Sequence, residues 1–206
     1  SVIRKEGNWL YKSISSFLKI IMVLNERDLR HKLVVDAAYR MMTAARTAPK
    51  GKGADIMEIM LVEERHDLDI LAQAMRQKSE KSGIKLLLRD ADNILQGEAV
   101  LLIGTRNKPV GTNCKYCGYN NCWEKPSEVP CAFNSIDLGI AVGSACSVAA
   151  DLRVDSRVMF SAGWASLSLG WLEGCSQIIA IALAAASKNP YFDRNSNKPI
   201  PTECFL

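Results

Sequence analysis

Four of the seven cysteines in this chain of 206 residues lie within 18 consecutive positions. They are Cys114, Cys117, Cys122 and Cys131, and their spacing is C-x2-C-x4-C-x8-C. Two thiolates three positions apart converge around a tight turn, and Gly118 allows the positive φ that such a turn often requires. Scattered core residues do not cluster in this way, so the spacing predicts a metal site.

The spacing leaves the identity of the metal open. A [4Fe–4S] cluster takes four thiolates from one loop-rich segment, which this segment supplies, and we favour that interpretation. A structural zinc site usually pairs two C-x2–4-C knuckles, whereas this segment has one. Two disulfides are a weaker alternative, because thiols stay reduced in the cytoplasm, where a chain without a secretion signal is expected.

The residues around the cysteines agree with metal binding. Lys115 and Lys125 favour the thiolate form that binds a metal. The aromatic side chains that could shield a cluster from water are Tyr116, Tyr119, Trp123 and Phe133. Cys146, Cys175 and Cys204 receive the opposite interpretation, because an isolated free cysteine usually behaves as a small buried hydrophobe.

The composition is that of a globular chain with a core, since 48% of the residues are hydrophobic and 23% are charged. The net charge of +4 comes entirely from residues 1–32, and residues 33–206 are neutral. Nucleic-acid binding needs a basic face on the folded domain, so no nucleic-acid partner is expected. The longest apolar run, 178–186, has nine residues. A membrane helix needs about 20, so we expect no transmembrane segment and a cytoplasmic protein.

Residues 1–21 have the pattern of a short amphipathic leader helix. Its apolar positions at helical spacing are Leu10, Ile14, Phe17, Leu18 and Ile21. Lys19 interrupts the apolar run and no small-residue cleavage site follows, so the segment is not a secretory signal. We expect an arm that docks on the domain or on a partner subunit. A membrane-surface helix is one alternative, and an extension before a natural start at Met22 is another.

Apolar periodicity predicts several helices and strands in the remaining chain. The expected helices are 28–48, 67–81 and 137–152, and the expected strands are 56–62, 99–105, 157–161 and 176–183. This order favours a three-layer α+β domain in which helices flank a mixed sheet. We therefore expect a single domain over 22–206, with a cysteine-rich metal-binding insert at about 107–135.

The loop 50–53 has the sequence Lys-Gly-Lys-Gly. Its N–H groups and its two ammonium groups could bind an anion. The loop follows a helix, so it is neither a Walker loop nor a dinucleotide fingerprint. A plain turn with solvated lysines is an equal alternative. The sequence has no nucleophile-elbow or zinc-protease motif, so hydrolases have no support.

Two further segments, 137–145 (DLGIAVGSA) and 188–194 (KNPYFDR), accompany the cysteine segment. Together the three resemble an uncharacterised bacterial and archaeal family of ferredoxin-domain-containing proteins, over about residues 22–195. The four-cysteine part is also similar to the iron–sulfur segment of corrinoid iron–sulfur proteins. This resemblance implies that a [4Fe–4S] cluster is bound by Cys114, Cys117, Cys122 and Cys131.

A more distant resemblance is to the nitroreductase flavoproteins. Residues 44–49 (AARTAP) with the strand 56–62, and the late strand 176–183, resemble corresponding parts of that fold. The resemblance implies a nitroreductase-like fold, a homodimer with sites at the subunit interface, and FMN reduced by a nicotinamide. The residues that could contact FMN or another anion are Lys50, Lys52 and Arg194. At 50–53, nitroreductases instead carry serine, asparagine and glutamine.

Three functions follow as hypotheses. The first is an iron–sulfur protein that moves electrons between a donor and an unidentified redox partner, on a nitroreductase-like scaffold and without a catalytic residue that can be named. The second is an FMN-dependent NAD(P)H oxidoreductase. The third is a non-catalytic module in which zinc holds the cysteine loop.

Overall fold

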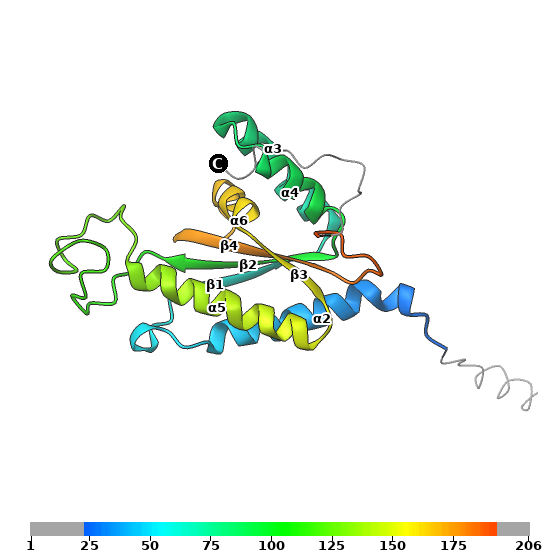
Figure 1. Ribbon diagram of the computed structural model, residues 1–206, viewed down its shortest axis with the longest axis horizontal. Helices are drawn as coiled ribbons and strands as arrows, with labels where there is room; N and C mark the ends of the chain where they lie inside the picture. The colour runs from blue at the N-terminus through cyan, green and yellow to red at the C-terminus, as the bar shows by residue number, and fades with distance from the viewer. Residues whose placement is uncertain (1–22, 193–206) are drawn as a thin grey trace, which may run out of the picture. The chain divides into compact units, whose positions relative to one another are not determined.

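A computed structural model describes residues 23–192 of the chain, which are coloured in Figure 1. The chain forms two compact units, Ser1–Arg30 and His31–Leu206. In the first unit, the described residues include the start of helix α2 (Glu26–Thr47), where Arg30 Nε donates to Glu26 at 2.8 Å. The leader helix predicted over 1–21 lies outside the described residues.

The second unit is built on a four-stranded sheet. The strands are β1 (Met57–Val62), β2 (Ala99–Arg106), β3 (Asp155–Met159) and β4 (Cys175–Ala184). Their order is β1-β2-β4-β3, and each neighbouring pair is antiparallel. The central strands β2 and β4 have long apolar runs because helices cover both faces of the sheet, which leaves neither face for polar side chains.

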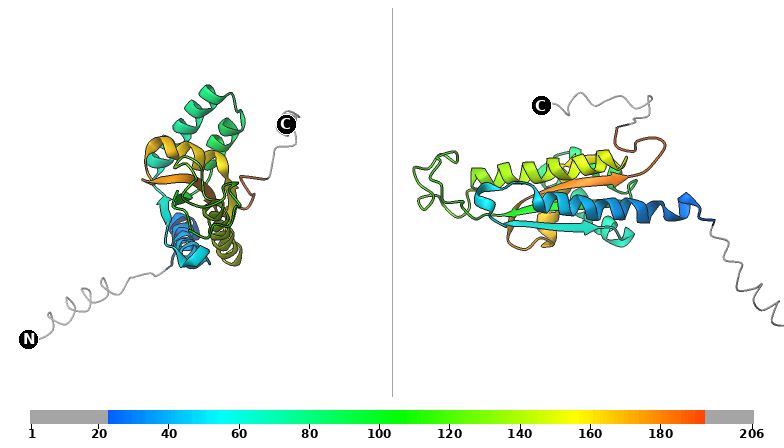
Figure 2. Two further views of the ribbon diagram at one scale, coloured as in Figure 1. Left: turned by 90° about the vertical axis from the view of Figure 1, so that its left-hand side faces the viewer. Right: turned by 90° about the horizontal axis from the view of Figure 1, so that it is seen from below.

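Helices form a layer on each side of this sheet (Figures 1 and 2). Alternate residues of β2 face the two helix layers in turn, because successive side chains of a strand point to opposite faces. Leu101 and Ile103 pack with α2 and α5 (Ala132–Asp151). Val100 and Leu102 pack with the opposite layer. The helices of that layer are α3 (Arg65–Ser82), α4 (Leu86–Ile94) and α6 (Phe160–Ser166). The predicted three-layer α+β fold is confirmed.

One detail of the predicted fold is corrected, because the described strands are antiparallel throughout and do not form a mixed sheet. Two helices, α3 and α4, connect β1 to β2. They carry the chain out and back, so β2 starts beside the end of β1, with Val62 opposite Val100. Sequence periodicity predicts one helix in this connection and gives no sign of α4.

The connection after β3 also differs from the prediction. A strand was expected over 157–161, whereas β3 ends at Met159 and α6 begins at Phe160. A Cβ atom added at Gly163 would lie 2.1 Å from the carbonyl oxygen of Ile178. The close packing of α6 on β4 therefore requires glycine at position 163. A short 3-10 helix, η2 (Leu167–Leu169), follows α6.

Of the described helices, α5 alone has the length and apolar composition to cross a membrane. That is weak support for a membrane span, because core helices often have the same properties. The residues of α5 that are buried between the helix and the sheet include Leu138, Ala141, Ala145 and Ala149.

Candidate metal centre

The four clustered cysteines lie on the connection between β2 and α5, which extends from one end of the sheet in Figure 1. From residue 107 to residue 131 this loop has turns and bends but no helix or strand. Four of its residues have a left-handed backbone, Gly111 (φ 76°), Asn113 (φ 49°), Lys115 (φ 65°) and Gly118 (φ 87°). The positive φ predicted for Gly118 is confirmed, and the N–H of Gly118 closes a turn by donating to Lys115 O at 2.8 Å.

Side chains, rather than a main-chain ladder, connect the distant parts of this loop. Asn113 Oδ1 accepts the N–H of Cys122 at 2.9 Å. Asn107 Nδ2 donates to Ser127 O and, at 3.1 Å, to Val129 O. No pattern in the sequence indicates this role for Asn107 and Asn113, because each contact joins residues whose proximity depends on the fold of the loop.

The base of the loop is fixed to the start of α5. Asn134 is 1% exposed, and its Nδ2 donates to Lys108 O at 3.0 Å. Lys125 is also buried, with its ammonium group bonded to Pro126 O at 3.0 Å and to Val129 O. The chain is therefore held firmly where it leaves β2 and where it enters α5.

The four cysteines differ in exposure. Cys114, Cys117 and Cys122 are partly exposed, whereas Cys131 is 5% exposed at the N-cap position of α5. All four are free thiols. The pKa of Cys114 is lowered by hydrogen bonds, first from the backbone at Tyr116 and then from the Thr112 hydroxyl. Three accessible thiols and one anchored thiol form a donor set that suits a thiolate-bound metal.

The sulfur atoms are not assembled into a closed site. Within residues 23–192, no three cysteine, histidine, aspartate or glutamate side chains are grouped so that they could hold a metal ion. The four thiols suit a metal by their chemistry, and binding one would require their sulfur atoms to come together from the positions seen here. Of the aromatic residues, Phe133 stacks on Tyr116 with ring centroids 6.0 Å apart, whereas Trp123 is 76% exposed.

The loop 50–53, which includes the 3-10 helix η1 (Gly51–Gly53), lies beside the cysteine loop. Lys52 Nζ donates to Gly111 O at 3.2 Å. Gly51 N–H donates to both carboxylate oxygens of Asp137 on α5, at 3.1 and 3.0 Å. Asp137 is 2% exposed. Its signal in the sequence was an acidic residue inside an otherwise apolar helix, whose other acidic residue, Asp151, is its last.

Of the three residues that could contact FMN or another anion, only Lys50 and Lys52 lie within the described residues. Lys50 Nζ donates to the carbonyl oxygens of Ala45, Arg46 and Ala48, at 2.9, 2.9 and 2.6 Å, and so caps the end of α2. Burial, with Arg46 nearby, lowers the pKa of Lys50. Arg194 lies outside the described residues. The ammonium groups of Lys50 and Lys52 both bind carbonyl oxygens in this structure. An anion site at Lys50, Lys52 and Arg194 stays a prediction.

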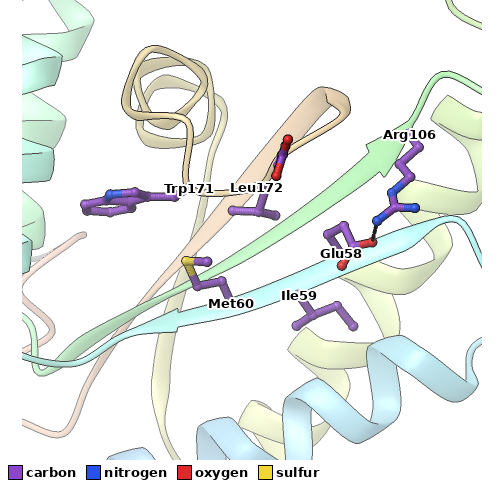
Figure 3. A pocket seen from close by; sticks show the side chains of 7 residues that line it. Glu58, Ile59, Met60, Arg106, Trp171 and Leu172 are labelled. Atoms are coloured by element: carbon purple, nitrogen blue, oxygen red, sulfur yellow. Dashed lines mark ion pairs between the residues drawn. The ribbon is translucent and has the colours of Figure 1, made fainter.

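A separate hollow of about 230 Å³ opens between β1, the end of β2 and the segment before β4 (Figure 3). Arg106 Nη2 pairs with Glu58 at 2.5 Å beside it, while Trp171 and Leu172 line the other side. Because the two charges neutralise each other, the hollow offers no excess positive charge to a phosphate. Cys175 lies nearby, and burial together with Glu58 raises its pKa to about 11.

The fold and the loop thus define a class, an α+β protein with a free-thiol loop between its second strand and a core helix. A model of a family described as "Uncharacterized protein containing a ferredoxin domain (DUF2148)" matches residues 127–194, which include Cys131. An "Uncharacterized protein" of Archaeoglobus fulgidus is 40% identical over 187 residues, covering 86% of this chain and all of that protein. The chain belongs to this ferredoxin-domain family.

Solved structures with the same fold are flavoproteins and nitroreductases. A BluB-like flavoprotein from Clostridium difficile aligns over 80% of this chain and 85% of its own, with a TM-score of 0.53 and 17% identity. A nitroreductase with bound FMN from Bacteroides fragilis aligns over 83% and 86%, with a TM-score of 0.54 and 14% identity. At such identities the similarity shows the nitroreductase-like fold alone.

Proposed function

We propose that the protein is an iron–sulfur redox protein in which Cys114, Cys117, Cys122 and Cys131 bind a [4Fe–4S] cluster. The observation that carries this proposal is the set of four free thiols on one loop whose two ends are hydrogen-bonded to each other. The ferredoxin-domain family and the nitroreductase-like fold both favour a redox role. A bound cluster would supply one-electron transfer.

The residues of the loop have separable roles in this proposal. Cys131 provides a thiolate at the start of α5, next to a helix N-terminus that stabilises negative charge. The other three cysteines approach it as the loop closes. Because the loop extends from the end of the sheet, a redox partner can come close to the bound group without passing through the core.

We also propose that the protein is cytoplasmic and forms a homodimer. The homodimer agrees with the exposed face of α5, which lacks charge over most of its length. The residues of this face are Ile136, Gly139, Ile140, Gly143 and Ser147. Sedimentation of the purified chain tests the dimer, and a monomer at micromolar concentration contradicts it.

The test of the proposed function is anaerobic purification followed by metal analysis. We expect a brown protein with iron and acid-labile sulfide in equal amounts, and an electron paramagnetic resonance signal after reduction by dithionite. Stoichiometric zinc with no iron would contradict the iron–sulfur function and favour a non-catalytic module in which zinc holds the cysteine loop. A purified protein that contains neither iron nor zinc would contradict a metal centre of any kind.

An FMN-dependent NAD(P)H oxidoreductase is the second candidate, favoured by a fold shared with a nitroreductase that binds FMN. Calorimetry with FMN and an assay of NADH or NADPH oxidation with added FMN test it. Absence of FMN binding would reject this candidate. FMN binding together with NADH or NADPH oxidation would support it and would give the cysteine loop an accessory role.

A further inference from the structure

Asn113 connects the parts of the loop that carry the first and the third cysteine. It precedes Cys114 in the chain, and its Oδ1 accepts the N–H of Cys122 at 2.9 Å, nine residues away. The main-chain hydrogen bonds within the described loop join residues no more than three positions apart, such as Gly118 to Lys115. The Asn113 side chain therefore holds the main chain at Cys122 close to the residue that precedes Cys114.

The backbone of Asn113 adds a second requirement. Its φ of 49° is left-handed, and asparagine, aspartate and glycine tolerate this region better than other residues. Of these three, only asparagine and aspartate carry a side-chain oxygen that can accept an N–H. Position 113 thus needs both a left-handed backbone and a short acceptor.

The same hydrogen bond occupies the N–H of Cys122. Hydrogen bonds from backbone N–H groups to cluster sulfurs are one of the factors that set the reduction potential of an iron–sulfur centre. An N–H held by Asn113 is not free to make such a bond. Loss of the Asn113 acceptor releases that donor beside a cysteine ligand.

We propose that Asn113 is a positioning residue of the metal centre, which aligns Cys122 with Cys114 and keeps the Cys122 N–H away from the cluster sulfurs. The inference rests on the proposed function for its metal site. It goes beyond that function because it assigns a role to a side chain that is not itself a ligand. Partners of this kind commonly change metal affinity by about 10- to 100-fold.

Three variants of the full chain separate the two requirements. Asn113→Gly keeps the left-handed backbone and removes the acceptor, whereas Asn113→Asp keeps both. Asn121→Ala is the matched control, because Asn121 lies in the same loop but bonds only to Glu124, three residues away. The probe is Co²⁺ added anaerobically to the metal-free protein, with thiolate-to-cobalt absorption as the readout.

We expect Asn113→Gly to weaken Co²⁺ binding by at least about tenfold, and Asn113→Asp and Asn121→Ala to remain within about threefold of the parent. The unfolding temperature of the metal-free protein should be the same in all four proteins. After cluster loading, the midpoint potential should rise in Asn113→Gly and not in Asn113→Asp.

The outcomes distinguish this inference from the proposed function. If Asn113→Gly matches the parent in Co²⁺ affinity and in potential, the role of Asn113 is overturned while the iron–sulfur function stands. An equal loss of affinity in Asn113→Asp overturns it as well. If the parent binds neither Co²⁺ nor iron, both the function and the role of Asn113 are wrong.

Discussion

Asp137 accepts the main-chain N–H of Gly51 with both of its carboxylate oxygens, and so ties the loop 50–53 to helix α5, which begins at Ala132. Replacing Asp137 with alanine leaves this part-buried N–H without its partner. We expect the free energy of unfolding to fall by about 1–3 kcal/mol. Asp137→Asn retains one acceptor and should lose less.

Urea denaturation followed by circular dichroism measures this difference. Asp151→Ala is the control, because Asp151 lies exposed at the other end of α5. Equal stability of Asp137→Ala and Asp151→Ala would mean that the tie to Gly51 contributes nothing.

A second prediction concerns the packing of α6 on β4. Alanine at position 163 would put a Cβ atom 2.1 Å from the carbonyl oxygen of Ile178, which is a backbone atom. The helix must then move, and overpacking of this kind costs about 1–3 kcal/mol or more. Gly139→Ala is the matched control, since nothing lies within 4 Å of the added Cβ on α5.

The control should gain up to about 1 kcal/mol, because alanine loses less backbone entropy than glycine in a helix. Thermal unfolding of the two variants measures the expected loss of stability in Gly163→Ala and the expected gain in Gly139→Ala. A Gly163→Ala protein as stable as the parent would contradict the close packing of α6 on β4.

The Cys175 thiol gives a pH-dependent prediction. Its pKa is raised to about 11 from an ordinary value of 9.0, so the folded protein retains a proton that the unfolded chain releases. Stability due to this group is therefore complete below pH 9.0 and is lost as the pH rises towards about 11. We expect the stability of the parent relative to Cys175→Ser to decrease over this interval.

Urea titrations of the two proteins between pH 8 and pH 11 measure the difference, which cancels the titration of lysines and tyrosines common to both. A difference that stays constant with pH would show that the Cys175 pKa is not raised.

Lys50 and Lys52 should respond differently to replacement by methionine. The Lys50 ammonium group caps three carbonyl oxygens at the end of α2, whereas Lys52 donates to one exposed carbonyl. Hydrogen bonds to charged groups contribute about 1.5–3 kcal/mol. We expect Lys50→Met to destabilise the fold by about that amount and Lys52→Met to have little effect, as measured by urea denaturation. If Lys50→Met retains full stability but loses anion binding, Lys50 is a ligand residue rather than a cap.

The metal centre predicts a contrast between two cysteines. Cys117→Ser should lose most of the iron and the visible absorption, because one of four thiolates is removed. Cys146→Ser should retain them, since Cys146 lies on α5 with its pKa raised by burial and is not in the loop. Iron assays on both proteins give the comparison, and full iron content in Cys117→Ser contradicts the assignment of Cys117 as a ligand.

Sequence periodicity was sufficient to predict the long elements of this fold. The helix ended by Pro49 and the apolar strands around Leu101 and Ile181 carry strong local patterns. By contrast, α4 has nine residues and no capping side chain, so nothing local marks its ends. The expectation of a mixed sheet came from the order of helices and strands along the chain and from the nitroreductase resemblance, and that order does not fix the direction of each strand.

The sequence was sufficient to propose the four cysteines of the candidate site, but not the hydrogen bonds that shape the loop around them. The cysteine spacing can be read directly, because its chemistry depends on residues close in the sequence. The bonds from Asn113 to Cys122 and from Asn134 to Lys108 depend on the path of the loop in space. The buried bond from Ser161 to Asp90 escaped prediction for the same reason, since 71 positions separate these residues.

The burial of Cys131 at the start of α5 makes the metal centre asymmetric in a mechanical sense. The side chain of Cys131 belongs to the core, whereas Cys114, Cys117 and Cys122 lie partly exposed on the outer loop. For the proposed metal centre, we expect uptake and loss of the metal to rearrange the outer loop and to leave the sheet and its helices in place. We therefore expect the metal-free protein to take up metal again without unfolding.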